Sequence, residues 1–404
     1  MVPNGWKLVE AKDVCESISV GVVIKPTQYY VEESEGVKAF RSANVREGFI
    51  NDNDWVYFSY EGHAANKKSQ LQAGDILIVR TGYPGTACVV TPEFSGSNAI
   101  DIVIARPNRK QIISEYLCAY TNSHMGKSQV LDLQGGMAQK HLNVGAYQVL
   151  KLKLPPLPEQ KKIAQILSTW DKAISTTEQL LANSQQQKKA LMQQLLTGKK
   201  RLLDKNGVRF SGEWRENHLR DVSEIVMGSS PKSSAYNETG DGMPLIQGNA
   251  DIKHRLSAPR VHTSEITKKC SQGDILLSVR APVGNVAISQ HEACIGRGIS
   301  SIKAKSNESQ DFLYQWLLWF EPRWGSLSQG STFESINSDD IKSLKMKIPY
   351  LEEQQKIAAV LSTADQEVSA LQQKLDTLKQ EKKALMQQLL TGKRRVKIDD
   401  KEVA

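Results

Sequence analysis

Cysteine is scarce in this chain and follows no pattern. The five cysteines are odd in number and scattered over 404 residues, without a CxxC pair. This usage favours reduced thiols in a cytoplasmic protein over a disulfide framework or a zinc site. The seven histidines form no HxH or HxxxH pair, so the sequence predicts no metal site.

Long apolar runs are also missing. The sequence has no run of 18 apolar residues, and residues 1–30 lack the basic-then-apolar layout of a signal peptide. We therefore expect neither a membrane span nor export. A hydrophobic content of 40% permits real cores in two or three domains. The 52 basic and 44 acidic residues give a net charge of +8, which is compatible with a polyanionic partner.

The common catalytic motifs do not occur either. There is no GxxxxGK[ST] phosphate loop, no GxGxxG after a strand and no GxSxG elbow. The Pro155-Pro156 pair is not the [DNS]PP[YFW] loop of amino-methyltransferases. Asp251 and Lys253 resemble part of a nuclease D/ExK motif, but such tripeptides arise by chance in a charged chain. The sequence therefore predicts a binding protein with no catalytic residues and no cofactor of its own.

What the chain does contain is a long internal repeat. Residues 154–201 and 348–395 align without a gap at an offset of 194, with 28 of 48 positions identical. Each copy opens on proline and glutamate and has no further proline or glycine before Gly198 or Gly392. These are start and C-cap signals. A run of about 38 residues predicts a helix of roughly 57 Å.

Apolar residues in both copies follow a heptad pattern, with alternating spacings of four and three residues. Lys188 and Lys382 fall at the same position of this seam, where a polar residue lowers stability but can fix pairing and register. We expect the two helices to pack on each other in a coiled coil, with faces left for partner helices. Two unrelated solvated helices are the alternative. The seam and docking residues are Ile163, Leu167, Trp170, Ile174, Leu181, Leu191, Leu195, Ile357, Leu361, Val368, Leu371, Leu375, Leu378, Leu385 and Leu389.

The segments before the helices echo each other more faintly. GDIL occurs at 74–77 and again at 273–276, and Trp6 corresponds to Trp214. Residues 1–153 and 202–347 are therefore two related α+β domains, followed by helices at 154–201 and 348–395 and a tail at 396–404. Their signals are mostly strands, among them 20–24 and the runs 73–81 and 272–280 that are entered through a Gly-Asp turn, with one helix each at 113–122 and 310–320.

Loops after the matched strands are the candidate binding sites. Each begins with arginine, which suits bidentate bonding to guanine or phosphate, although that arginine could instead pair with the neighbouring sheet. Gly-rich backbone ahead of each long helix could donate to phosphates, or could simply be the connection that leads into that helix. Asn44 is matched with Gln247 and Asn249 of the other half, and these could be turn residues rather than base contacts. The Lys67-Lys68 pair could be a solvated loop. The candidates are Arg80, Thr81, Gly82, Tyr83, Gly135, Gly136, Gln139, Lys140, Asn44, Lys67, Lys68, Arg280, Gln247, Asn249, Ser331 and Thr332.

Each of the two variable domains is followed by a helix that begins near LPPLPEQKKIA and ends in KKALMQQLLTGKKR. In this arrangement the chain resembles the specificity subunit (HsdS) of type I restriction-modification enzymes. The resemblance covers essentially the whole chain. The GDIL strands and Met227–Pro231 (MGSSP) agree with it, although GSSP has no clear counterpart at 21–26.

The resemblance implies a non-catalytic subunit whose two target recognition domains each recognise one half of a split, asymmetric double-stranded DNA sequence. It implies antiparallel helices that dock two methyltransferase subunits, and restriction subunits that complete the enzyme. S-adenosylmethionine, ATP and Mg²⁺ would then belong to those partners. The helices would also set the gap between half-sites, so four residues inserted near Leu196–Gly198 would lengthen it. A coiled-coil adaptor that binds proteins without DNA specificity is the main alternative. A self-sufficient nuclease or methyltransferase, or the specificity subunit of another restriction type, are others.

Overall fold

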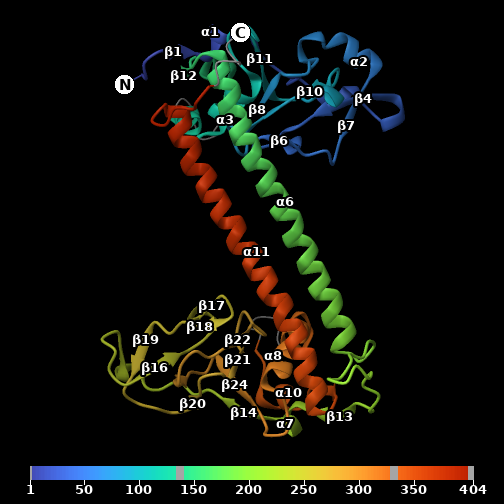
Figure 1. The fold of residues 1–404 in the computed structure, drawn as a ribbon, viewed down its shortest axis with the longest axis vertical. Coiled ribbons are helices and arrows are strands. Elements are labelled where there is room, and N and C mark those ends of the chain that lie inside the picture. The colour runs from blue at the N-terminus through green and yellow to red at the C-terminus, as the bar shows by residue number, and fades with distance from the viewer. Residues whose placement is uncertain (1, 133–140, 328–334, 399–404) are drawn as a thin grey trace. The chain divides into compact units, whose positions relative to one another are not determined.

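The computed structural model describes residues 2–132, 141–327 and 335–398. The chain forms two compact units, Met1–Gln179 with Gln373–Ala404, and Leu180–Gln372. Each unit combines one mixed domain with the first part of one long helix and the last part of the other. These helices are α6 (Leu157–Leu195) and α11 (Leu351–Thr391), and each is a continuous ribbon in Figure 1.

The first unit contains two four-stranded sheets, with orders β2-β11-β8-β9 and β10-β4-β7-β3, and a two-stranded sheet of β1 and β12. Its strands are β1 (Lys7–Glu10), β2 (Cys15–Val20), β3 (Tyr30–Val31), β4 (Gly36–Phe40), β5 (Val45–Arg46), β6 (Phe49–Ile50), β7 (Val56–Ser59), β8 (Ile76–Val79), β9 (Ala87–Val89), β10 (Asn98–Ala99), β11 (Ile102–Pro107) and β12 (Lys151–Leu154). Its shorter α-helices are α1 (Ala11–Val14), α2 (Tyr60–Ala65), α3 (Ser114–Asn122), α4 (His124–Asp132) and α5 (Val144–Gln148).

The second unit repeats this plan. The order β14-β24-β21-β22 matches β2-β11-β8-β9 and continues into β18 and β17, while β15-β19-β16-β23-β20 forms the second sheet and β13 pairs with β25. Its strands are β13 (Arg215–His218), β14 (Ser223–Met227), β15 (Tyr236–Asn237), β16 (Met243–Ile246), β17 (Ile252–Lys253), β18 (Leu256–Ser257), β19 (Val261–Thr263), β20 (Lys269–Cys270), β21 (Ile275–Ser278), β22 (Val286–Ile288), β23 (Ala293–Ile295), β24 (Ile299–Ala304) and β25 (Lys345–Ile348). Its shorter α-helices are α7 (Leu219–Val222), α8 (Gln310–Phe320), α9 (Trp324–Leu327) and α10 (Ser338–Lys342).

The α+β class and the duplicated plan are confirmed, but one expected strand is wrong. The apolar run at 20–24 predicted a strand there, whereas β2 ends at Val20. Beyond Val20 the backbone passes close to Ala99, where a Cβ at Gly21 would lie 2.3 Å from the Ala99 carbonyl oxygen. Val22 then forms only an isolated bridge, with Ile100. A Cβ at Gly228, in the GSSP segment, would likewise lie 2.2 Å from the Gly296 carbonyl oxygen. Gly21 is therefore the counterpart that the sequence comparison did not find.

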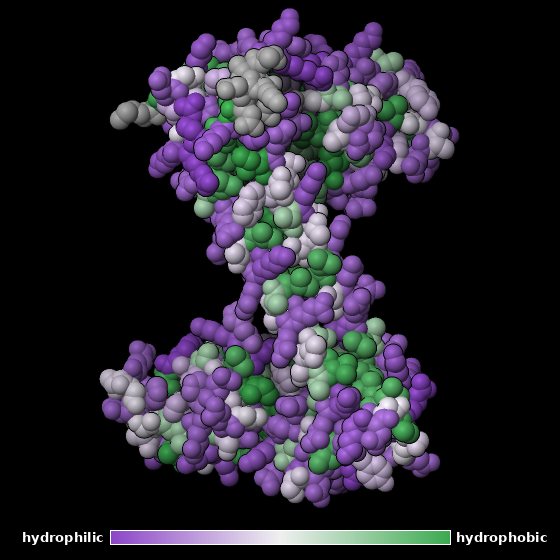
Figure 2. All heavy atoms as spheres, in the orientation of Figure 1, coloured by the Kyte–Doolittle hydropathy of each residue, from purple (hydrophilic) through white to green (hydrophobic). Residues whose placement is uncertain are grey.

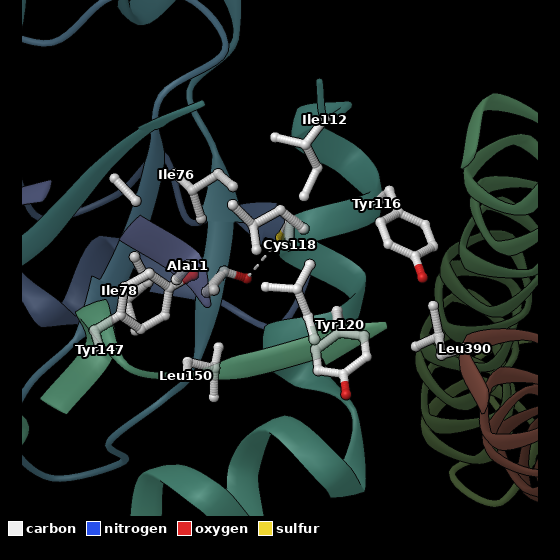
Figure 3. Packing of buried hydrophobic residues seen from close by; sticks show 14 of the residues in the cluster. Ala11, Ile76, Ile78, Ile112, Tyr116, Cys118, Tyr120, Tyr147, Leu150 and Leu390 are labelled. Atoms are coloured by element: carbon white, nitrogen blue, oxygen red, sulfur yellow. Dashed lines mark hydrogen bonds between the residues drawn. The ribbon is translucent and has the colours of Figure 1, made fainter. Parts of the chain in front are cut away.

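The core of each unit extends from the sheet, through the helix that covers it, to the long helices. In the first unit, α3 presents Tyr116 and Tyr120 toward Leu390 of α11 (Figure 3), and all three side chains are buried. On the sheet side of α3, Ile76 and Ile78 of β8 are buried in the same cluster. Burial removes apolar surface from water and is the main force that holds a domain to its helices.

The heptad seam predicts the packed face of both helices. Every residue in the two predicted rows of α6 and α11 is buried or half-buried. In the first unit Asp171 pairs with Lys382, at 2.5 Å, and Glu178 pairs with Lys379, at 2.7 Å. Partner numbers fall in α11 as they rise in α6, so the segments run antiparallel, as expected.

Both polar seam positions are filled by equivalent ion pairs. Lys382 pairs with Asp171 in the first unit, and Lys188 pairs with Asp365 in the second. Each lysine lies 194 residues from the other, and so does each aspartate. A lysine in a largely apolar seam is tolerated where a carboxylate compensates its charge, so these pairs favour this antiparallel register over others.

A double-mutant cycle at Lys382 and Asp171 is expected to give a coupling free energy of about 1 kcal/mol, because the lysine is largely buried and the register holds both partners in place. Alanine variants, single and double, would be compared by urea unfolding. The control is the more exposed Lys379–Glu178 pair, which should give less than about 0.5 kcal/mol. Equal coupling at the two pairs would contradict a special role for the seam lysine.

A bidentate ion pair closes the start of each long helix. In the first unit, Arg395 donates to both carboxylate oxygens of Glu159, at 2.6 and 2.8 Å. In the second unit, Arg201 does the same to Glu353, with both distances 2.6 Å. We call these the Glu159 clasp and the Glu353 clasp. In each clasp a tryptophan of the adjacent domain lies under the guanidinium.

The helix ends explain how the arginines reach the clasps. Gly198 and Gly392 adopt left-handed φ angles of 72° and 70°, as the predicted C-cap requires. The amides of Lys200 and Arg394 then bond back to the carbonyls of Gln194 and Gln388, at 3.1 and 3.2 Å. This turn reverses the chain, so the basic residues after the glycine fold back toward the clasp.

Candidate nucleic-acid interface

The loop after β8 begins with an arginine that is engaged within the domain. Arg80 is 9% exposed. Its Nε donates to the Leu142 carbonyl at 3.1 Å, and its guanidinium also bonds Asp101 and His141. These contacts fit the alternative in which the arginine pairs with its own domain, because they occupy all three guanidinium nitrogens.

The corresponding arginine of the second unit is placed differently. Arg280 follows β21 and is exposed, and its backbone forms an isolated bridge with Ser335. The sequence treated Arg80 and Arg280 as equivalent, yet only Arg280 presents its side chain to solvent. The difference arises because the fold brings Asp101, His141 and the Leu142 carbonyl to the Arg80 guanidinium, and local sequence does not reveal these distant partners.

Replacing each arginine by alanine separates the two roles. Arg280→Ala is expected to weaken specific DNA binding by about 1–3 kcal/mol with little change in stability. Arg80→Ala is expected instead to destabilise the first unit by about 1–3 kcal/mol, because it leaves Asp101 and the Leu142 carbonyl without their donor. Thermal unfolding and filter binding at several salt concentrations would measure both effects. A binding loss for Arg80→Ala at unchanged stability would restore the original assignment.

The rest of the first loop is open to solvent. Thr81, Gly82 and Tyr83 are exposed, and the Tyr83 side chain is 83% exposed. Together with Arg46 and Ser42 they line a pocket of about 550 Å³. Lys67 and Lys68 are also exposed and border a second pocket of about 420 Å³. All of these residues are therefore accessible to a ligand.

Asn44 is a buried turn residue. Its side chain accepts from the Arg41 amide at 2.9 Å and donates to the carbonyls of Asn51 and Asn53, at 3.2 and 2.8 Å. These bonds fix the turn that leads into β5, and they use both ends of the amide, which favours the structural interpretation.

The counterpart of Asn44 in the second unit is Asp251, not Asn249. Asp251 accepts from the Gln247 amide at 2.8 Å and precedes β17, as Asn44 precedes β5. Asn249 instead bonds Asn285 in the loop after β21. The sequence comparison missed this match because the two turns differ in length by one residue. Gln247 and Asn249 are half-buried.

The remaining predicted residues, Gly135, Gly136, Gln139, Lys140, Ser331 and Thr332, lie outside the described residues. Their assignment stays a prediction.

Within the described ranges the structure has no helix long and apolar enough to cross a membrane. In the same ranges no group of three His, Cys, Asp or Glu side chains is placed to hold a metal ion. Burial raises the pKa of the Cys15 and Cys88 thiols to about 12, so neither is an activated nucleophile. Hydrophilic side chains cover most of the visible surface of each unit (Figure 2).

Comparison with known proteins identifies the family. The model of the type I restriction modification DNA specificity domain matches residues 3–183 and 211–380. The putative type I restriction enzyme MjaX specificity subunit of Methanocaldococcus jannaschii is 32% identical over 422 residues, which cover 98% of this chain and 95% of the relative.

Two solved structures resemble the whole chain. One comes from work on complex assembly and conformational transition of the type I R-M system. It is 26% identical with a TM-score of 0.61, covering 98% of this chain and 100% of that chain. The HsdS subunit from Thermoanaerobacter tengcongensis is 25% identical with a TM-score of 0.50, covering 97% and 98%. The chain therefore belongs to the family of type I restriction-modification DNA specificity subunits, the non-catalytic components of these enzymes.

Proposed function

We propose that each mixed domain recognises one half of a bipartite, asymmetric DNA target. The proposed boundaries are 1–153 and 202–347 for the recognition domains, 154–201 and 348–395 for the helices, and 396–404 for the tail. One observation carries the proposal: the two domains share their sheet order, but the loops after their matched strands differ, since Arg80 is buried and Arg280 is exposed. A common scaffold with different loops is suited to two different half-sites.

The long helices then have two tasks. They space the recognition domains, and they dock two methyltransferase subunits, to which restriction subunits are added. The seam residues themselves are buried or half-buried, so docking uses the exposed faces, where Leu180 is 48% exposed. We assign S-adenosylmethionine, ATP and Mg²⁺ to the partner subunits and adenine methylation to the assembled complex.

The test is to map methyladenine by long-read sequencing in the native host, with and without this gene. Loss of methylation at a two-part motif with an unread gap supports the proposal and reveals both half-sites. Unchanged methylation at every motif, in a strain that expresses the chain, contradicts it. Re-expression of the gene from a plasmid controls for effects on neighbouring genes.

A further inference from the structure

Two short hairpins, one in each unit, carry a matched pair of side chains. In the β5–β6 hairpin, Arg46 lies directly opposite Phe49, and in the β17–β18 hairpin, Lys253 lies directly opposite Leu256. Directly opposed residues on antiparallel strands point to the same face. Each hairpin therefore presents one cation beside one apolar side chain, at positions that correspond at an offset of 207.

All four side chains are exposed. Phe49 is 62% exposed and Leu256 is 41% exposed. A single exposed apolar side chain is ordinary. Here the same position of the same hairpin is apolar and exposed in two domains whose loops otherwise differ, with a cation opposite it each time. That recurrence favours a contact surface over chance exposure.

The hairpin tips are held by the sheet beneath them. The Gly48 amide donates to the Ala87 carbonyl of β9 at 2.9 Å, and the Ile288 amide of β22 donates to the Arg255 carbonyl, also at 2.9 Å. At the base, the buried Asn44 and Asp251 turns described above fix the strands that enter each hairpin. The exposed pair therefore stands on rigid backbone.

An ion pair also ties each hairpin to the segment that follows the covering helix. Glu47 pairs with Lys127 of α4, and Arg255 pairs with Glu321 at 2.7 Å. The hairpin supplies the acidic partner in the first unit and the basic partner in the second, but the ion pair joins the same two segments in both. These ion pairs neutralise the charge of Glu47 and occupy the guanidinium of Arg255. Arg46 and Lys253 are the cations of the hairpin strands that face solvent.

We propose that both hairpins enter the DNA groove of their half-site, with Arg46 and Lys253 on backbone phosphates and Phe49 and Leu256 on base edges. The major groove admits a two-stranded ribbon, and apolar side chains contact the thymine methyl group there. Phosphate contacts position a protein, whereas base contacts specify sequence. A cation stands at the same hairpin position in both domains, whereas the apolar residue opposite it differs, and this pattern matches that division. The inference rests on the proposed function, and it makes Phe49 and Leu256 determinants of specificity.

The experiment co-expresses the full chain with its methyltransferase partner in a host that lacks other adenine methylation, and maps the methylated motif. Phe49→Ala is expected to slow methylation about tenfold and to relax a position in one half-site only. Leu256→Ala should do the same in the other half-site. The matched controls are Tyr60→Ala and Ile266→Ala, which remove side chains that are 63% and 46% exposed elsewhere in the same units. Both controls should keep the wild-type motif and rate.

Further variants keep the outcome decisive. Phe49→Leu and Leu256→Phe retain an apolar side chain, and each should shift base preference in its own half-site without loss of expression. Arg46→Ala should weaken binding alike at all sequences and reduce the slope of log affinity against log salt by about one. Wild-type motif and rate in both alanine variants would overturn the inference. A wild-type chain that directs no bipartite motif would overturn the proposed function, and this inference with it.

Discussion

One heptad inserted into each long helix is expected to lengthen the unread gap of the DNA target by about three base pairs. Seven helical residues add roughly 10 Å, and one base pair occupies about 3.4 Å along the duplex. The insertions belong between Gln179 and Leu180 and between Gln373 and Lys374, which are equivalent exposed positions of α6 and α11. A whole heptad keeps the seam in register.

The structure argues against an insertion near Leu196–Gly198, the position that the sequence alone suggested. Leu196 is buried in the core of the second unit, and Gly198 lies against Trp214 with a φ of 72°. Four residues inserted there would break the C-cap and displace the Glu353 clasp, so a loss of activity would say nothing about spacing.

Motif mapping by methyladenine sequencing measures the outcome of the heptad insertions. The expected result is that both half-sites stay as they are, the gap grows, and wild-type sites lose their methylation. A matched insertion of four residues controls for length alone, because it disrupts the heptad pattern and should lower stability. Heptad variants that keep both activity and the original gap would refute a spacing role for the helices.

The long helices were predictable because their signals are local and repeated. Heptad spacing, an acidic first turn and a C-cap glycine all lie within one segment, and α6 and α11 lie within the repeated segments 154–201 and 348–395. Strands entered through Gly-Asp turns were also predicted well. The strand expected at 20–24 ends at Val20 because the backbone of Ala99, far away in sequence, lies against Gly21.

The candidate site was less predictable for the same reason. Arg80 looked like a DNA-binding arginine until the fold brought Asp101 and His141 beside it. The hairpins at β5–β6 and β17–β18 were missed because strands of two residues carry almost no periodicity. The Asn44 and Asp251 turns that precede the hairpins lie 207 residues apart. Aligning the two halves at this offset would have matched Arg46 with Lys253 and Phe49 with Leu256.

Membership of a DNA specificity family also removes the alternative of an adaptor without DNA specificity.

Arg201→Ala is expected to destabilise the second unit by about 3–5 kcal/mol, which is the usual cost of leaving a buried carboxylate without its cation. Glu353 is 2% exposed, and Arg201 donates to both of its oxygens. Arg395→Ala should cost the first unit about half as much. Urea unfolding would measure the total loss, and hydrogen exchange would locate it in one unit.

The difference between the two clasps comes from their tryptophans. Trp6 donates its Nε1 to Glu159 at 2.9 Å, so that carboxylate keeps a partner when Arg395 is removed. The Nε1 of Trp214 is buried with no hydrogen-bond partner among the described residues. Arg395 is also more exposed than Arg201, with side-chain exposures of 44% and 20%. Water can therefore replace some of the hydrogen bonds that Glu159 loses when Arg395 is removed.

A second substitution tests whether the unpaired charge is the cause. Adding Glu353→Gln to Arg201→Ala removes the buried negative charge and should recover part of the lost stability, whereas Glu353→Gln alone should be destabilising because the arginine then loses its counter-ion. Arg201→Lys should fall between wild type and alanine, since an ammonium cannot bond both oxygens in the planar geometry of a guanidinium. Equal losses for Arg201→Ala and Arg395→Ala, with no recovery in the double variant, would mean that the clasps act through packing on the tryptophans. The chain would then hold each domain to its helices by apolar contact, and the bidentate pairs would only orient the arginine.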